Sequence, residues 1–147
     1  MEKQTIKTVL VTGVFDILHQ EHLNFLQKAQ ALGDRLVVGI ESDVRVKELK
    51  GPDRPINSQK ERVLALEKLE LAAEVFVLPE QFSQPADHLA LLEKIKPNIL
   101  AVSESSPHID KKEKLMERVG GKVIVVHKHN PTISTTQILE VGKLQGI

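Results

Sequence analysis

Short apolar runs recur along the chain and are separated by stretches with helical spacing. The interiors of these runs are nearly all apolar, which is typical of strands buried on both faces of a parallel sheet. The runs lie at Thr8–Thr12, Arg35–Ile40, Glu74–Leu78, Ile99–Val102 and Lys122–Val126. We therefore expect each of them to form a strand.

Helical patterns fill most of the segments between the runs. Ser58 followed by Glu61 matches a capping box at the start of one helix, and Gly33 is predicted to be the C-cap of another. The predicted helices cover residues 22–32, 59–71, 85–96, 110–119 and 134–144. The segment 41–57 is predicted to be irregular. Alternating strands and helices predict an α/β fold, namely a single Rossmann-like, doubly wound parallel sheet of about five strands with helices on both faces.

Length and composition narrow the class of protein. The chain has 147 residues, which suits a single domain over residues 1–147. Its 20 basic and 20 acidic side chains cancel, which argues against a general nucleic-acid binder. Cysteine is absent, which excludes disulfides and thiolate metal sites and fits a cytoplasmic protein. We find no signal peptide, and no apolar run approaches the roughly 18 residues that span a bilayer.

The loop between the first strand and the first helix carries the strongest chemical signal. Parallel sheets bind ligands beyond the carboxyl ends of their strands. Gly13 is expected to let the backbone approach a ligand, and a helix starting near His22 offers free N–H groups to an anion. His19 and His22 are three residues apart and can face one phosphate together. The same spacing also suits a surface pair or a partial metal site, which would still need another ligand.

Three segments, in order along the chain, resemble motifs of a known family. Gly13-Val14-Phe15-Asp16 followed by His19-x-x-His22 resembles the signature of the cytidylyltransferase-like nucleotidyltransferases, and Ile133–Ile138 (ISTTQI) resembles their I-S-T-T/S-x-I motif. The segment Lys47–Arg62, with its K-x-x-K-G-x-x-R-P-I-N pattern, is similar to the bacterial heptose-1-phosphate adenylyltransferases.

The resemblance implies a role for each matched residue. The triphosphate and the transferring phosphorus would be contacted by His19 and His22, and Lys47 would bridge the phosphates of the two substrates. Lys50 and Arg54 would bind the acceptor substrate. Asp16 would hold the loop or contact metal and substrate, although it could equally cap the turn that follows it. The remaining nucleotide-binding residues would be Thr12, Gly13, Val14, Phe15, Arg62, Ser134, Thr135 and Thr136.

Two further roles compete with structural ones. Arg62 could hold phosphate with several donors, or it could pair locally with a carboxylate. Ser134 could cap its helix in any protein. No side chain is assigned to a metal of the protein's own, but the resemblance implies Mg²⁺ (magnesium) bridging the phosphates.

The chain departs from the family pattern at two places. Glu21 stands where the family has a glycine between the two histidines. Its carboxylate could point to solvent, or it could weaken triphosphate binding or change the base preference. After the fourth strand, the segment 103–108 (SESSPH) lacks the lysine of the adenylyltransferases, which removes a cation from the expected site.

The resemblance implies an enzyme that transfers AMP or CMP from a nucleoside triphosphate to a phosphorylated acceptor such as a sugar phosphate, with release of pyrophosphate. Glycerol-3-phosphate cytidylyltransferase and FAD-synthetase-like enzymes are alternatives within that class. A non-catalytic nucleotide-binding protein on the same fold, or a metal-binding protein using His19 and His22, are alternatives outside it. A homodimer is expected by resemblance, and neither nucleic acid nor membrane is expected as a partner.

Overall fold

The computed structural model describes residues 6–126. Its core is a five-stranded parallel sheet with the strand order β3-β2-β1-β4-β5. The strands are β1 (Thr8–Gly13), β2 (Arg35–Ile40), β3 (Glu74–Val77), β4 (Ile99–Ser103) and β5 (Lys122–Val126). The chain proceeds outward from β1 to β3 and then crosses to β4 on the other side of β1. The strand order therefore switches between β1 and β4, where doubly wound sheets bind their ligands.

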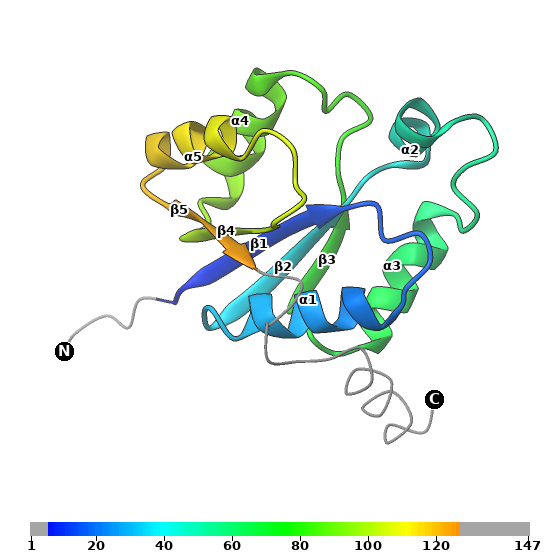
Figure 1. Ribbon diagram of the computed structural model, residues 1–147, viewed down its shortest axis with the longest axis horizontal. Helices are drawn as coiled ribbons and strands as arrows, with labels where there is room; N and C mark the ends of the chain where they lie inside the picture. Colours follow the sequence, from blue (N-terminus) through cyan, green and yellow to red (C-terminus); the bar gives the residue numbers. More distant parts are fainter. Residues whose placement is uncertain (1–5, 127–147) are drawn as a thin grey trace.

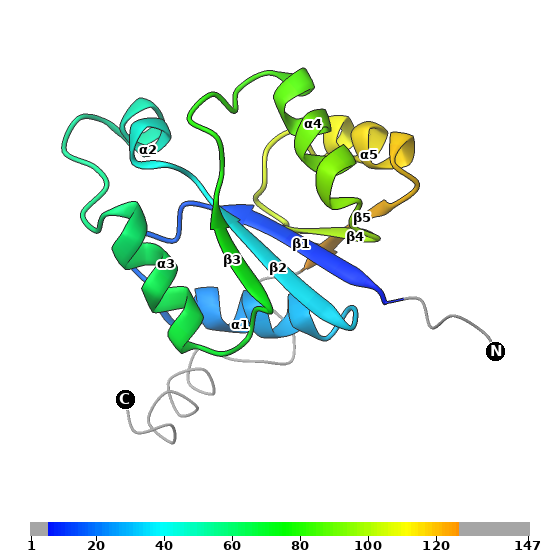
Figure 2. The same ribbon diagram turned by 180° about the vertical axis from the view of Figure 1, so that it is seen from behind.

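Helices cover both faces of the sheet, as the sequence predicts. On one face lie α1 (Gln20–Gln30) and α3 (Gln59–Lys68), and on the other lie α4 (Pro85–Ile95) and α5 (Ile109–Arg118), as Figures 1 and 2 show. The remaining helix of the described residues, α2 (Asp43–Lys50), lies beyond the carboxyl end of β2. The predicted fold class is confirmed, and the strand bounds agree with the prediction to within a residue.

The core has two halves, one on each face of the sheet. Leu26 and Ala29 of α1 and Leu66 of α3 pack against one face of the strands. Leu92 of α4 and Met116 of α5 pack against the other. Because neighbouring residues of a strand point to opposite faces, the β1 residues Val9 and Val11 belong to the first half and Leu10 to the second. This explains why the strands read as continuous apolar runs.

The prediction that residues 41–57 are irregular is wrong for α2. This helix buries only Val46, while Val44 and Leu49 are exposed, so it shows no apolar stripe. The signal that could have revealed it lies at its ends. The Ser42 hydroxyl accepts a hydrogen bond from the Arg45 backbone N–H at 3.2 Å, and Gly51 ends the helix with a φ of 110°.

Gly33 is not the C-cap of α1. The helix ends at Gln30 with Ala31 as the C-cap, in a right-handed conformation. A Cβ at Gly33 would lie 2.8 Å from both the Lys7 carbonyl oxygen and Val9 Cγ2. The glycine therefore lets the turn after α1 approach the start of β1.

No helix among residues 6–126 is long and apolar enough to cross a membrane.

Candidate active site

The loop after β1 turns sharply around Phe15. Phe15 has a φ of 50°, and its side chain is buried. A Cβ at Gly13 would lie 2.8 Å from Cε2 of the Phe15 ring, so the ring occupies the space that the glycine leaves open. The expectation that Gly13 makes room for a ligand is therefore incomplete, because the glycine first makes room for Phe15.

The two histidines lie side by side at the start of α1. The helix begins at Gln20, two residues before the predicted start, so His19 is the N-cap and His22 lies in the first turn. Their rings are stacked with centroids 3.9 Å apart, and the His19 backbone N–H donates to His22 Nδ1 at 3.3 Å. An Nδ1 that accepts this bond leaves the ring hydrogen of neutral His22 on Nε2, as a donor. The pair thus adds side-chain donors to the N–H groups of the helix start.

A pocket of about 560 Å³ opens beside these histidines, at the carboxyl ends of β1 and β4. It contains the predicted residues His19, His22 and Lys50 together with the predicted loop residues Thr12–Phe15. Glu21 also lines it, so the residue that stands in place of the family glycine borders the site. The full lining is Thr12, Gly13, Val14, Phe15, His19, Glu21, His22, Phe25, Lys50, Ala101, Val102, Ser103, Ser105, Ser106, Pro107 and Lys112.

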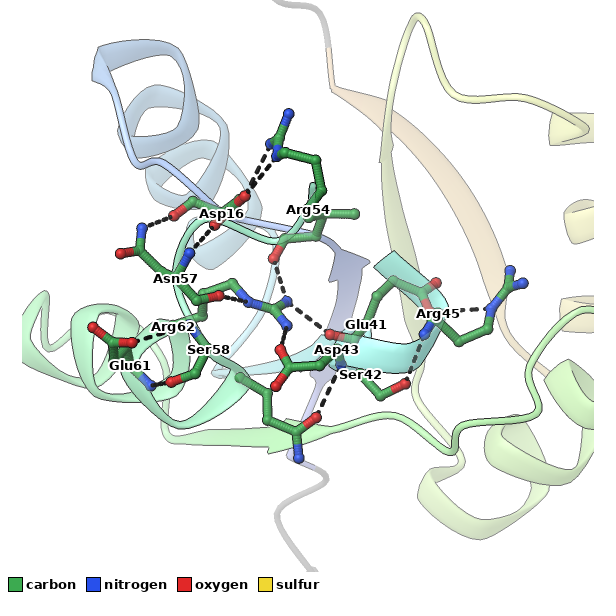
Figure 3. A network of polar contacts seen from close by, with 12 residues as sticks. Asp16, Glu41, Ser42, Asp43, Arg45, Arg54, Asn57, Ser58, Glu61 and Arg62 are labelled. Carbon is green, nitrogen blue, oxygen red and sulfur yellow. Dashed lines mark hydrogen bonds and ion pairs between the residues drawn. The ribbon is translucent and has the colours of Figure 1, made fainter. Parts of the chain in front are cut away.

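Asp16 lies outside the pocket and fixes the chain between Arg54 and Asn57 (Figure 3). Its carboxylate accepts backbone hydrogen bonds from Ile56 and Asn57, both at 2.8 Å, and pairs with Arg54 at 2.9 Å. Burial by itself favours the neutral acid, but these bonds outweigh it and hold the pKa of Asp16 below its ordinary value. Of the three roles expected for Asp16, these contacts match that of holding the loop.

Arg62 does not line the pocket, although it was expected to bind phosphate. The side chain is fully buried and donates to the carbonyl oxygens of Asn57, Val14 and Glu41 at 3.1, 3.0 and 2.7 Å. Its Nη2 pairs with Asp43 at 2.8 Å. The guanidinium therefore ties the β1 loop, the end of β2 and α2 to α3, and its donors are directed at the protein itself (Figure 3).

Arg54 and Lys47 also lie outside the pocket lining. Arg54 is held by Asp16, with about a third of its side chain exposed. Lys47 is exposed on α2, in the turn before the pocket residue Lys50. A lysine on an exposed helix that packs little can move toward a ligand, so this placement is compatible with the predicted bridging role.

Sequence reasoning placed the segment 103–108 at the expected site, but it missed Lys112, which completes the wall of the pocket opposite α1. This wall consists of Ser103 at the end of β4, Ser105, Ser106 and Pro107 from the β4–α5 loop, and Lys112 from α5. Lys112 stands among Lys111 and Lys114 in a helix rich in charge, so nothing in the sequence separates it from solvated neighbours. Only the packing of α5 on the sheet distinguishes it.

The histidine pair has no third metal ligand in the part of the chain that the structure describes. Among residues 6–126, no group of three or more His, Asp or Glu side chains is placed to hold an ion. Asp16, the one candidate named from sequence, directs its oxygens at residues 54–57 instead. The predicted residues Ser134, Thr135 and Thr136 lie outside the described residues.

Comparison with known proteins decides the family. The Cytidylyltransferase-like family model matches residues 10–141, which is nearly the whole chain. The chain belongs to the cytidylyltransferase-like family. The match includes the β1 loop, the histidine pair and the lysines of α2, and it confirms the family that the motifs predict.

Curated relatives of this family member include several proteins named Bifunctional protein HldE. The one from Syntrophotalea carbinolica is 37% identical over 142 residues, which is 95% of this chain and 28% of the relative. The one from Wolinella succinogenes is 47% identical over 94 residues, which is 64% of this chain and 19% of the relative. The chain thus spans less than a third of the length of these relatives.

Solved structures share the fold at low sequence identity. The lipopolysaccharide core biosynthesis protein from Thermoplasma volcanium matches with a TM-score of 0.67 and 24% identity, over 84% of this chain and 96% of that one. A pantoate-beta-alanine ligase from Francisella tularensis matches with a TM-score of 0.62 and 18% identity, over 97% of this chain and 71% of that one.

Proposed function

We propose that this protein transfers a nucleotidyl group from a nucleoside triphosphate to a phosphorylated small molecule and releases pyrophosphate. The observation that carries the proposal is the pocket at the switch in strand order. It brings the His19–His22 pair and the start of α1 to face lysine side chains from α2 and α5. Donors and cations around one pocket suit two phosphorylated substrates.

The reaction needs no covalent enzyme intermediate. An oxygen of the acceptor phosphate attacks the α-phosphorus of the triphosphate, a new P–O–P bond forms, and the bond from the α-phosphorus to the α,β-bridging oxygen breaks. Pyrophosphate leaves with the electron pair of that bond. The work of the protein is alignment and neutralisation of the charge that builds on the phosphate oxygens.

The pocket residues divide this work. His19 and His22 donate to oxygens of the triphosphate at the start of α1, where the helix dipole also favours negative charge. Lys47 and Lys50 lie on one turn of α2 and supply mobile positive charge between the two substrates. In this proposal Ser134, Thr135 and Thr136 keep their predicted contacts with the β- and γ-phosphates. Arg62 and Asp16 act at a distance, by holding the loops that shape the pocket.

Magnesium fits this site as a companion of the triphosphate. Both oxygens of Asp16 already accept hydrogen bonds, so Asp16 is not a suitable ligand. Among the described residues that line the pocket, Glu21 is the sole carboxylate. Mg²⁺ commonly takes its ligands from phosphates, waters and one or two carboxylates. It would neutralise phosphate charge when bound, with phosphate oxygens and water as its ligands.

The acceptor is proposed to be a sugar phosphate and the nucleotide ATP. The Lys47–Arg62 segment supports this choice, because it resembles the heptose-1-phosphate adenylyltransferases and lies within the part of the chain that matches the HldE relatives. CTP with glycerol 3-phosphate, and ATP with FMN, are the alternatives within the class. A chain without cysteine suits the reducing cytoplasm, where we place the reaction.

A pyrophosphate-release assay tests the proposal. Purified protein with Mg²⁺ is incubated with each of the four common nucleoside triphosphates and a panel of sugar 1-phosphates, glycerol 3-phosphate and FMN. We expect release that requires both substrates and is fastest with ATP and a sugar phosphate. Folded protein that turns over none of the pairs contradicts the proposal.

A second candidate is a nucleotide-binding protein without catalysis. The specific observation that favours it is Glu21, which places a carboxylate in the pocket where the family has a glycine. Calorimetric binding of a nucleotide in the micromolar range or tighter, together with no turnover of any pair, would favour this candidate over the enzyme.

We also propose a homodimer, by resemblance to the family. Light scattering coupled to size-exclusion chromatography should give a mass of about twice the 16.4 kDa of the chain. A mass near that of the single chain, at concentrations from micromolar upward, contradicts this prediction.

A further inference from the structure

Lys112 enters the pocket from the wall opposite the histidines. It lies on α5, which covers the face of the sheet opposite α1 (Figure 2). The side chain is half-buried, and Lys112 lines the pocket with the β4–α5 loop. Thr12, at the end of β1, lies in the same lining. The pocket therefore has cations or donors on both walls.

The ammonium group of Lys112 has little compensation from the protein. Its Nζ donates to Ser106 Oγ at 2.8 Å, and among residues 6–126 it makes no ion pair. Lys112 also lines a small, mostly apolar cavity together with His88, Leu91, Leu92 and Leu115. Burial accordingly lowers the pKa of Lys112. A half-buried ammonium with one hydroxyl partner is better stabilised when an anion joins it.

We propose that Lys112 binds the phosphate of the acceptor substrate. This inference rests on the proposed function for the reaction that takes place in the pocket. In an in-line displacement the attacking and leaving oxygens lie on opposite sides of the α-phosphorus. The histidines and the start of α1 receive the triphosphate on one wall, so the acceptor phosphate approaches from the wall of Lys112 and the loop serines.

This assignment also accounts for a departure in the sequence. The segment 103–108 has serines where the adenylyltransferases that it resembles carry a lysine. Lys112 brings a cation to the same pocket from the next helix, and Ser106 holds that cation at the edge of the loop. Lys112 thus supplies, from another position of the chain, a positive charge on the side of the pocket where the segment 103–108 has no lysine.

The test compares Lys112→Met with Lys112→Arg and with the control Lys111→Met. Lys111 is exposed and does not line the pocket, so its replacement removes one positive charge from the same helix outside the pocket. Binding is measured by calorimetry for two probes without turnover. One is α,β-methylene-ATP with Mg²⁺, and the other is glucose 1-phosphate in the presence of that analogue. Inorganic phosphate replaces the sugar phosphate in a further titration, and thermal melts check folding.

We expect Lys112→Met to weaken both phosphate probes at least tenfold and to change the affinity for the analogue less than twofold. Lys112→Arg should keep binding within about threefold, and Lys111→Met should resemble the wild type. Wild-type protein that binds neither phosphate probe, equal effects of the two methionine variants, or a loss confined to the nucleotide would overturn the inference. The proposed function fails if the pyrophosphate-release assay detects no turnover. The role of Lys112 is tested separately, because calorimetry measures phosphate binding without any reaction.

Discussion

At the scale of single residues, the fold converts several expected ligand contacts into structural ones. Asp16 and Arg62 stand in motif positions that suggested substrate contacts, yet both direct their polar atoms at the protein backbone. Their acceptors and donors come from segments up to 48 residues away in the chain, such as the Val14 carbonyl that meets Arg62. No local pattern could reveal such partners. The histidine pair, whose residues are neighbours in one helical turn, was predictable from spacing.

Glu21 is the residue whose replacement should improve the site. We expect Glu21→Gly to lower the KM for the nucleoside triphosphate by on the order of tenfold, because a carboxylate in the pocket repels phosphate oxygens. Steady-state kinetics with the acceptor held saturating measures the change.

A matched variant, Glu21→Gln, separates charge from bulk. It should recover most of the gain if charge dominates, and little of it if the size of the side chain matters more. A KM that rises in both variants contradicts this account and would indicate that the carboxylate helps to hold Mg²⁺ or the nucleotide.

Asp16 should make stability depend on pH. Its folded pKa lies below the unfolded value of about 3.9, so its charge stabilises the fold above about pH 4, and that contribution is lost as the pH falls through the folded pKa. Asp16→Asn should cost about 2 kcal/mol near neutral pH, where hydrogen bonds to a charged group are lost. Urea unfolding from pH 3 to 7 tests this. The difference between wild type and variant should shrink toward pH 3, and a constant difference contradicts the prediction.

At the scale of elements, the apolar pattern predicted the strands and helices that bury at least one face. It missed the helix that buries almost none of its surface, α2. The strands are buried on both faces and were found with nearly correct bounds, whereas α2 buries one residue and was missed. Yet α2 carries Lys50, which lines the pocket, and the exposed Lys47 one turn before it. Its position depends on Asp43 pairing with Arg62 of α3. This helix is thus held by polar contacts together with Val46, its one buried side chain.

Removal of that anchor should destabilise the fold. Arg62→Met leaves the Asp43 carboxylate and several carbonyls without their donor, and we expect a loss of about 3–5 kcal/mol in the free energy of unfolding. Lys60→Met is the control, because Lys60 is exposed on the same helix. Denaturant unfolding of both variants should separate them clearly. Two equal and small losses would show that Arg62 does not anchor α2.

At the scale of the whole molecule, the switch in strand order between β1 and β4 determines where the pocket lies. Alternation of strands and helices predicted that the loop after β1 would border a site, and the pocket lies there. The contribution of Lys112 to the opposite wall was not predictable, because this residue reaches the pocket only through the packing of α5 on β4 and β5. Although the chain has no net charge, Lys50 and Lys112 both line this pocket at the carboxyl ends of β1 and β4.

The central claim is nucleotidyl transfer in this pocket, and ³¹P NMR of the reaction tests it most directly. Wild-type protein with Mg²⁺ should convert ATP and a sugar 1-phosphate into a nucleoside diphosphate sugar and pyrophosphate, and the two products should form in equal amounts. His19→Ala should slow this by on the order of a hundredfold, as loss of a donor to the transition state does. Gln27→Ala, an exposed site on the same helix, should not. Equal rates in the wild type and His19→Ala, or product signals from neither, would contradict the account.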